Sequence, residues 1–333
     1  MVASLFDRIV VVDWSAHTGP KRGADSIWLC SLDAGTRGRP DSEVLENIPT
    51  RLEAHARLAE LIAPRATTGS TDRPTRTLLA VDVALGYPRG TAHSAGLIGT
   101  SRRRPWESMW QHLATSYREG ARNRPEREHD RWTVATELNR RLVASGSGLH
   151  FWGCPPRRAS ADLTTRRPPV GGLRTDRACE ARLREAGLRP FSVWQLLGAG
   201  AVGSQTLTAI PMLEALRHDV GPGGRSVVWP FETGIDPAGV TAAFDDATVV
   251  IAEIWPGTLS SQVVDACITD HSSAVKDARQ VTALARHLRA LDRDQELLPL
   301  FCPELDAATA DAVVAEEGWV LGLPRPGDSS TTR

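Results

Sequence analysis

The sequence contains few cysteines and no paired metal-binding spacing. Its five cysteines, Cys30, Cys154, Cys179, Cys267 and Cys302, lie far apart and form no Cys-x-x-Cys pair. An odd number of separated thiols is typical of reduced, mostly buried cysteines in a cytosolic protein, and it argues against a disulfide framework or a cysteine zinc site. The nine histidines form no His-x-x-x-His pair either, so the common helical zinc motif is excluded.

The chain also lacks a long apolar run and an excess of either charge. No uninterrupted apolar stretch is long enough to span a bilayer, and the N-terminus has no charged-then-apolar leader. We therefore expect a cytoplasmic protein with no membrane partner. The formal net charge of -1 produces no global positive field, so a groove for nucleic acid must be built locally.

What the chain does have is three apolar runs that each carry a single acid. The runs and their acids are Arg8–Asp13 with Asp13, Leu78–Leu85 with Asp82, and Ala247–Pro256 with Glu253. A run without polar alternation predicts a strand that is buried on both faces. A carboxylate in such a strand costs free energy unless a partner compensates its charge, and neither Asp82 nor Glu253 has a basic residue close in the sequence.

A fourth acid opens a predicted helix. Asp277, Val281, Leu284, Leu288 and Leu291 follow the three-four spacing of one helical face, so Asp277 begins the stripe that packs on the sheet. Open α/β sheets place their sites at the carboxyl ends of strands. Clustered carboxylates there are ligands for a pair of divalent cations, Mg²⁺ or Mn²⁺. The alternative is that each acid only caps a turn or complements the helix dipole.

Several short segments spread over the chain carry a family resemblance. They are Val12–Ala16, Pro20–Lys21, Asp25–Trp28, Val81–Pro88, Val228–Gly234, Ala252–Pro256, Val275–Ala278 and Glu316–Trp319. In these segments the chain resembles the domain of unknown function 429 family of predicted RNase H-like nucleases. The resemblance implies an α/β fold with an RNase H-like mixed central sheet and helices on both faces. It also implies a metal site made of Asp13, Asp82, Glu253 and Asp277, and no particular substrate.

The order of predicted elements suits this fold and α/β folds in general. Strands are expected up to residue 13, around 26–32, near 44–48 and up to 82, with a helix over 52–62. We expect residues 1–90 and 190–323 to form the core, 91–189 to form a helical insertion that caps or rims the sheet, and 324–333 to be disordered. Helices near 106–117 and 132–143 and a loop over 159–173 are expected inside the insertion.

Arginines alternate with tryptophans in the expected insertion. They are Arg102–Arg104, Arg157–Arg158 and Arg166–Arg167, with Trp106, Trp110, Trp132 and Trp152. Guanidinium groups bind phosphate and indoles stack on bases, so nucleic acid or a nucleotide is an expected partner. The alternative is a solvated arginine face over core tryptophans, because acids are mixed through the same region. His150, a lone histidine beside aromatic residues, is expected to be structural.

A glycine motif offers a different function. Gly198, Gly200 and Gly203 satisfy the G-x-G-x-x-G fingerprint, and Asp219 stands near the position of a ribose-binding acid, which would indicate an NAD(P)-binding oxidoreductase. However, Pro211 is expected to interrupt the helix that must follow the motif. The family that the chain resembles carries a similar glycine-rich stretch, and this resemblance implies a tight turn whose backbone approaches the site. The residues assigned to substrate binding are Lys21, Gly198, Gly200 and Gly203.

Two further classes of function remain open. An RNase H-like core is shared with ATP-dependent phosphotransferases, but there Trp14 would replace the small residue that allows close phosphate approach. The other class is a catalytically silent binding protein. Ser15 and Ser204 have no nucleophile-elbow context, so a serine hydrolase is disfavoured.

Overall fold

The computed structural model describes residues 4–35, 40–64, 75–99, 103–198, 200–259 and 275–323. Within them the chain forms two compact units: residues up to 82, 216–304 and 320–323 make the first, and 83–215 with 305–319 make the second. The expected insertion, 91–189, lies inside the second unit, which also takes in residues 83–90, 190–215 and 305–319. The expected disordered tail, 324–333, falls outside the described residues.

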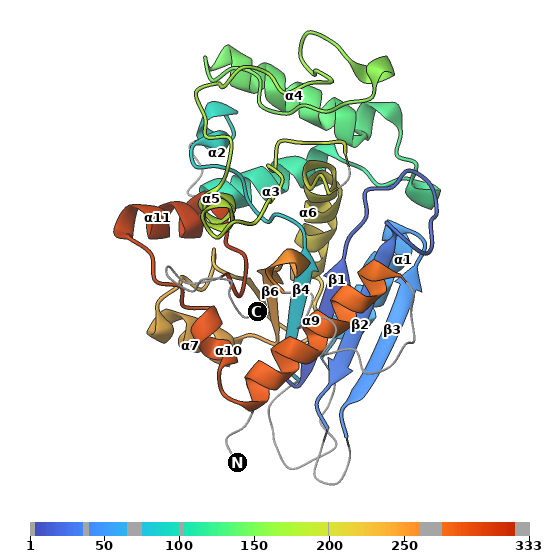
Figure 1. The fold of residues 1–333 in the computed structure, drawn as a ribbon, viewed down its shortest axis with the longest axis vertical. Coiled ribbons are helices and arrows are strands. Elements are labelled where there is room, and N and C mark those ends of the chain that lie inside the picture. The colour runs from blue at the N-terminus through green and yellow to red at the C-terminus, as the bar shows by residue number, and fades with distance from the viewer. Residues whose placement is uncertain are drawn as a thin grey trace. The chain divides into compact units, whose positions relative to one another are not determined.

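The first unit contains a mixed six-stranded sheet in the order β3-β2-β1-β4-β6-β5 (Figure 1). Its strands are β1 (Arg8–Asp13), β2 (Ile27–Asp33), β3 (Ser42–Ile48), β4 (Thr77–Asp82), β5 (Ser226–Val228) and β6 (Val249–Glu253). β2 pairs antiparallel with both β1 and β3, whereas the β1–β4, β4–β6 and β5–β6 pairs are parallel. The expected α/β class with a mixed sheet is confirmed.

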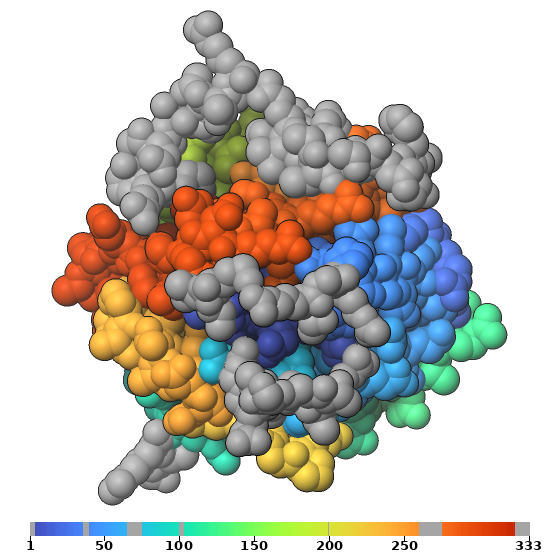
Figure 2. Space-filling model, turned by 90° about the horizontal axis from the view of Figure 1, so that it is seen from below, coloured from blue at the N-terminus to red at the C-terminus, as the bar shows by residue number. Residues whose placement is uncertain are grey.

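Two helices of the first unit, α1 (Arg51–Ile62) and α9 (Lys276–Arg293), cover opposite faces of the sheet. The Arg8 side chain donates to the carbonyl of Leu61 in α1, whereas the Cys30 thiol hydrogen-bonds Thr282 in α9. Cys30 is paired with Val11, three positions from Arg8, and side chains an odd number of positions apart leave a strand on opposite faces. Figure 2 shows the orange surface of α9 beside the blue surface of β2 and β3.

The remaining helices of the first unit are shorter, and one helix joins the two units. They are α7 (Pro237–Asp246), η4 (Pro256–Thr258) and α10 (Leu297–Leu300), with α6 (Gly203–His218) as the connecting helix. Contrary to our expectation, Pro211 does not interrupt α6. Proline removes one intrahelical hydrogen bond, a cost of about 3 kcal/mol. Burial of Leu207, Ile210 and Leu213 around it offsets that cost, because the helix is enclosed by apolar side chains.

The second unit is built mainly of helices. They are α2 (Thr91–Ser94), α3 (Pro105–Ser116), η1 (Ala121–Asn123), η2 (Arg127–His129), α4 (Arg131–Ala144), η3 (Pro156–Arg158), α5 (Ala178–Glu185), α11 (Ala307–Ala312) and the π-helical turn η5 (Val313–Glu317). The expected helices at 106–117 and 132–143 correspond to α3 and α4 within one residue at each end. Trp106 and Trp110 are buried and pack edge to face at 5.4 Å, so these two tryptophans are core anchors.

Two buried glutamates hold loops of the second unit together. Glu316 accepts hydrogen bonds from the backbone amides of Gly90 and Ala92, both at 2.6 Å, and Glu317 accepts one from Ala178 at 2.6 Å. Burial raises the pKa of Glu316 to about 7, with the neighbouring charge of Glu317 adding to the effect and the two amides opposing it. The charged form of Glu316 is therefore less favourable in the folded unit than in water.

We expect the Glu316 carboxyl to make stability depend on pH. The folded chain retains a proton that the unfolded chain has released between pH 4.5 and about 7, so this contribution to stability is lost as the pH rises through that window. Relative to Glu316→Gln, the unfolding free energy of the wild type should fall by up to about 3 kcal/mol between pH 5 and pH 7. Urea unfolding of both proteins across this range measures it, and an unfolding free energy of the wild type that stays level or rises with pH relative to Glu316→Gln would contradict it.

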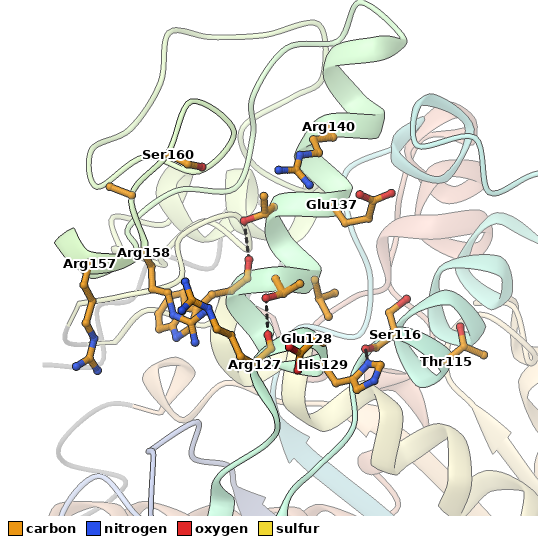
Figure 3. A pocket seen from close by; sticks show the side chains of 15 residues that line it. Thr115, Ser116, Arg127, Glu128, His129, Glu137, Arg140, Arg157, Arg158 and Ser160 are labelled. Atoms are coloured by element: carbon orange, nitrogen blue, oxygen red, sulfur yellow. Dashed lines mark hydrogen bonds between the residues drawn. The ribbon is translucent and has the colours of Figure 1, made fainter.

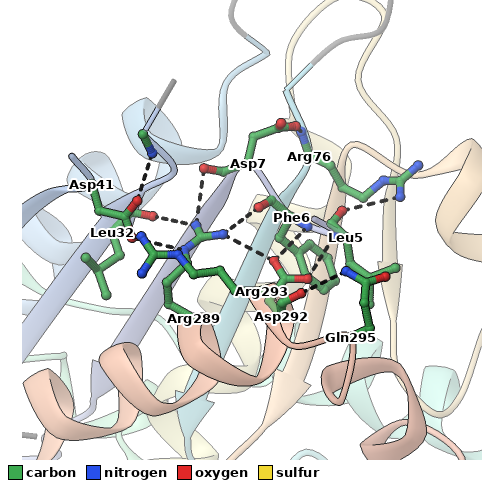
Figure 4. A network of polar contacts seen from close by, with 11 residues as sticks. Leu5, Phe6, Asp7, Leu32, Asp41, Arg76, Arg289, Asp292, Arg293 and Gln295 are labelled. Atoms are coloured by element: carbon green, nitrogen blue, oxygen red, sulfur yellow. Dashed lines mark hydrogen bonds and ion pairs between the residues drawn. The ribbon is translucent and has the colours of Figure 1, made fainter. Parts of the chain in front are cut away.

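A polar network ties the N-terminal segment of the first unit to the end of α9 (Figure 4). The Asp292 carboxylate accepts from the amides of Leu5 and Phe6 at 2.7 and 3.2 Å and pairs with Arg289 at 3.2 Å. Arg289 also donates to the carbonyls of Phe6, Asp7 and Leu32. Both side chains are almost fully buried, so the pair depends on these partners; Arg289 Nε, which has no hydrogen bond, lies 3.9 Å from Asp41 Oδ2.

Two remaining features of the described residues are the apolar character of the helices and the state of the cysteines. None of the described helices has the length and apolar character that crossing a membrane requires. Cys30, Cys154, Cys179 and Cys302 are free thiols, and Cys267 lies outside the described residues.

Candidate metal centre

Asp13 and Asp82 end two adjacent parallel strands and stand directly opposite each other. The β1–β4 register pairs Asp13 with Asp82, and adjacent strands lie about 4.8 Å apart. Paired residues project from the same face of a sheet. Asp13 is two positions from Val11, so both acids project from the face that α9 covers. The structure thus brings together two of the four predicted ligands.

The loop that follows Asp13 is fixed by a buried arginine. Arg51, the first residue of α1, is fully buried and donates from Nη1 to the carbonyls of Ser15 and His17 at 3.1 and 3.0 Å. Because α1 is itself anchored on the sheet by Leu58 and Leu61, this contact restrains the chain immediately beyond the acid. Asp13 therefore lies at the junction between strand β1 and a loop that Arg51 of α1 restrains.

Asp277 reaches the same region from the first turn of α9. Its Oδ2 atom accepts a hydrogen bond from the backbone amide of Asp25 at 2.7 Å, and its charge raises the pKa of both Asp13 and Asp82. The apolar stripe of α9 is buried as the spacing predicts, through Val281, Leu284 and Leu288. Packing of that stripe on the sheet carries the start of the helix to the carboxyl ends of the strands.

Glu253 lies close to this group, but strand alternation directs it elsewhere. The β4–β6 register pairs Glu253 with Val81 rather than with Asp82, so its side chain leaves the sheet on the face opposite Asp82. The residue is only 3% exposed, and its carbonyl accepts from the amide of Leu321 at 2.8 Å. Its charge still raises the pKa of Asp82. Of the four predicted ligands, Glu253 is the one that the register sets apart.

The acids of this group strongly disfavour one another's charge. Burial raises the pKa of Asp13 to about 8, with Asp277 and then Asp25 adding to the effect and Lys276 opposing it. Burial also raises the pKa of Asp82 well above 3.8, with contributions from Asp13, Glu253 and Asp277. Such a group either retains protons or binds a cation that compensates its charge.

Lys21 stands at the edge of the acidic group through its contact with Asp25. Lys21 Nζ lies 3.3 Å from Asp25 Oδ2, and the Lys21 amide donates to the carbonyl of Pro49. Asp25 and Lys276 were not predicted as site residues, although both lie in segments that carry the family resemblance. Asp25 adopts a left-handed backbone conformation with φ of 53°, which is uncommon for a residue other than glycine and is enriched at functional sites.

The donor chemistry of the group suits a hard cation, because its ligands are all carboxylate oxygens. In the part of the chain that the structure describes, no three His, Cys, Asp or Glu side chains are already placed to hold a metal ion. The predicted assignment of Asp13, Asp82 and Asp277 as metal ligands stays a prediction.

The predicted glycine turn belongs to the second unit, whereas Asp13 and Asp82 belong to the first, and its contact with substrate stays a prediction. Gly198 and Gly200 have positive φ values of 126° and 80°, and Gly203 opens α6 with its amide donating to the carbonyl of Gln195. A side chain at Gly203 would place Cβ 2.5 Å from the carbonyl oxygen of Val193, so close backbone packing requires glycine there.

The structural context of the glycine turn is not that of a dinucleotide site. Residues 191–198 form turns and an isolated bridge between Gln195 and Trp152, not the strand that must precede such a loop. We therefore expect no saturable binding of NAD or NADP by the wild type or by Gly200→Val. Fluorescence titration with both nucleotides measures this, and saturable binding that Gly200→Val abolishes would restore the oxidoreductase hypothesis.

His150 has the structural role expected for it. Its Nε2 atom lies 3.0 Å from the carbonyl oxygen of Ser147, its backbone amide donates to the side chain of Asn139, and its ring packs on Trp194 at 5.1 Å. Burial lowers the pKa of this imidazole, so it stays neutral in the second unit near neutral pH.

Comparison with protein-family models, with curated proteins and with solved structures found no match to the chain. The resemblance to the domain of unknown function 429 family therefore stays a prediction from the quoted segments.

Proposed function

We propose that the first unit is an RNase H-like core that hydrolyses a phosphodiester with the help of Mg²⁺ or Mn²⁺. The observation that carries the proposal is the direct pairing of Asp13 with Asp82 at the carboxyl ends of adjacent parallel strands, with Asp277 beside them. Clustered carboxylates at this edge of an α/β sheet are the donor set that two-metal phosphoester hydrolysis uses.

The strand arrangement supports the finer fold assignment. Three strands, β1 to β3, form an antiparallel meander, α1 crosses over, and β4 returns parallel to β1 on its other side. An RNase H-like core requires this order and places the first acid at the end of β1. Since α/β folds of other function share parts of this order, the acids rather than the sheet carry the functional argument.

Each residue of the group has a definite part in the proposed chemistry. Asp13 and Asp82, on one face of the sheet, would bind the cations between them, and Asp277 would complete the ligand set from α9. Lys21, paired with Asp25, would approach the phosphate of the substrate as a cation. The bound cations would supply an activated water and charge stabilisation of the leaving oxygen.

The test is hydrolysis of bis(p-nitrophenyl) phosphate and of single- and double-stranded DNA and RNA oligonucleotides. We expect cleavage of at least one of these substrates with Mn²⁺ and none in excess EDTA. Full cleavage in EDTA would exclude the mechanism. Metal-dependent transfer of phosphate from ATP without phosphodiester cleavage would favour a phosphotransferase on the same fold, and no activity in any assay would favour a binding protein.

A further inference from the structure

The second unit contains a cavity of ≈ 550 Å³ that is separate from the acids described above (Figure 3). Its walls come from the end of α3, the turn η2, the first half of α4 and the turn η3 with the residues after it. All of its lining residues belong to the second unit. A volume of this size is in the range of small-molecule sites, which span roughly 300–1,000 Å³.

Arginines dominate the charged lining of this cavity. The charged side chains are Arg127, Arg140, Arg157 and Arg158 against Glu128 and Glu137. Figure 3 shows Arg158 extending toward α4, Arg140 projecting from α4, and Arg157 at the outer edge. With the partners of Arg158 and Arg140 counted, the carboxylates of Glu128, Glu137, Asp130 and Asp162 balance these four guanidinium groups, so the case for an anionic ligand rests on Arg127 and Arg157.

Part of this charge is already compensated by acids outside the lining. Arg158 is paired with Asp130, and Arg140 with Asp162 at 2.7 Å. Within the described residues, no acid or carbonyl lies within bonding distance of the guanidinium groups of Arg127 and Arg157. Arginine forks that lack a protein partner and face the same cavity are suited to bind phosphate oxygens.

The anchoring of Arg158 also preorganises the cavity. Asp130, its partner, is buried and caps α4 by accepting from the amides of Trp132 and Thr133 at 3.0 and 2.9 Å. Arg158 is therefore fixed against the helix, whose first amides are already satisfied. On the same rim, Ser160 Oγ accepts from the amides of Asp162 and Leu163, both at 3.2 Å, so its hydroxyl proton is left to donate.

An aromatic wall lies beside these cations. Trp132 lines the cavity and is held by the guanidinium of Arg131, which stands 4.5 Å from its ring centroid. The guanidinium groups of Arg127 and Arg157 and the hydroxyl of Ser160 lie beside the indole edge of Trp132. Together they suit a ligand with a phosphate at one end and an apolar or aromatic group at the other.

We propose that this cavity binds a phosphomonoester of about the size of a mononucleotide, with Arg127, Arg157 and Ser160 contacting the phosphate and Trp132 contacting the remainder. The proposal rests on the second unit alone and does not depend on the proposed hydrolysis. Of the arginine clusters in the expected insertion, Arg157–Arg158 line this cavity, and the proposed phosphate contacts Arg127, Arg157 and Ser160 are exposed and therefore accessible to a ligand.

Calorimetric titration in buffer containing EDTA tests it, with AMP and inorganic phosphate as separate probes. We expect saturable binding of AMP to the wild type and weaker binding of phosphate at the same residues. The double variant Arg127→Gln/Arg157→Gln should weaken AMP binding by about 100-fold, because each lost charge-assisted hydrogen bond is worth about tenfold. Arg225→Gln, an exposed arginine of the first unit, should leave binding unchanged and serves as the control.

Three outcomes would overturn the proposal. They are no saturable AMP binding by the wild type, equal affinity for AMP and phosphate, and undiminished binding by the folded double variant. Because EDTA removes divalent cations, and Asp13→Asn should bind AMP as the wild type does, failure here leaves the proposed hydrolysis intact. The converse holds as well, since loss of nuclease activity in Asp13→Asn would not affect this titration.

Discussion

Asp13→Asn is expected to weaken Mn²⁺ binding by more than about 100-fold and to stabilise the metal-free protein. Loss of a ligand should exceed the roughly 10- to 100-fold effect of removing an outer-shell partner. Stabilisation is expected because Asp13 shares its surroundings with Asp277 and Asp82, so a neutral side chain removes the cost of a partly buried charge and the repulsion among these half-buried acids. A residue that served only as a turn cap would lower stability when replaced and would leave metal binding unchanged.

The gain in stability should depend on pH in a defined direction. The pKa of Asp13 is raised from 3.8 to about 8, so the folded wild type retains a proton that the unfolded chain has released within this window. The stability of the metal-free wild type therefore falls as the pH rises from about 4 to 8, by at most about 1.4 kcal/mol per pH unit for this proton. Asp13→Asn lacks this dependence, so its advantage should grow with pH.

Calorimetric titration with Mn²⁺ and thermal unfolding in EDTA at pH 5, 7 and 8.5 measure the two effects. Asp245→Asn, the same substitution at a largely exposed acid of α7, serves as the matched control and should change neither quantity. Unchanged Mn²⁺ affinity in Asp13→Asn would overturn the metal centre. A metal-free variant that melts below the wild type at pH 8.5 would contradict the electrostatic account.

Asp292→Ala is expected to lower the unfolding free energy by about 3–5 kcal/mol, the usual cost of removing one partner of a buried ion pair. The substitution removes the closer carboxylate partner of Arg289, whose side chain is 3% exposed, and leaves Asp41 Oδ2 at 3.9 Å from its Nε; it also removes the acceptor of the Leu5 and Phe6 amides. Arg289 still donates to three backbone carbonyls, but the carboxylate of Asp292 no longer compensates the positive charge of the guanidinium group. The N-terminal segment should detach from α9 before the sheet unfolds.

Arg293→Ala is the matched control, since Arg293 lies one position from Asp292 and pairs with Asp41 at 2.6 Å with a side chain that is 58% exposed. Its loss should cost less than about 1 kcal/mol. Urea unfolding of both variants at pH 7 gives the comparison. Equal destabilisation by the two substitutions would show that the buried network (Figure 4) does not hold the N-terminal segment.

Local patterns in the sequence were sufficient for the strands that carry the acids. Unbroken apolar runs predicted β1 and β4, each of which ends at its acid, and the three-four stripe predicted the buried face of α9. These signals are local because burial on one or both faces imposes its own period on the side chains. The helices expected near 106–117 and 132–143 likewise correspond to α3 and α4 within one residue at each end.

Pairing and register were decided only by the tertiary structure. Nothing in the runs themselves shows that Asp13 faces Asp82 or that Glu253 is displaced by one position, because strand register depends on hydrogen bonds between segments more than sixty residues apart. A shift of one residue moves a side chain to the other face, which is why the register sets Glu253 apart from Asp82, and its assignment as a metal ligand stays a prediction. Likewise, burial of α6 overrode the helix-breaking tendency of Pro211, since packing outweighs one missing hydrogen bond.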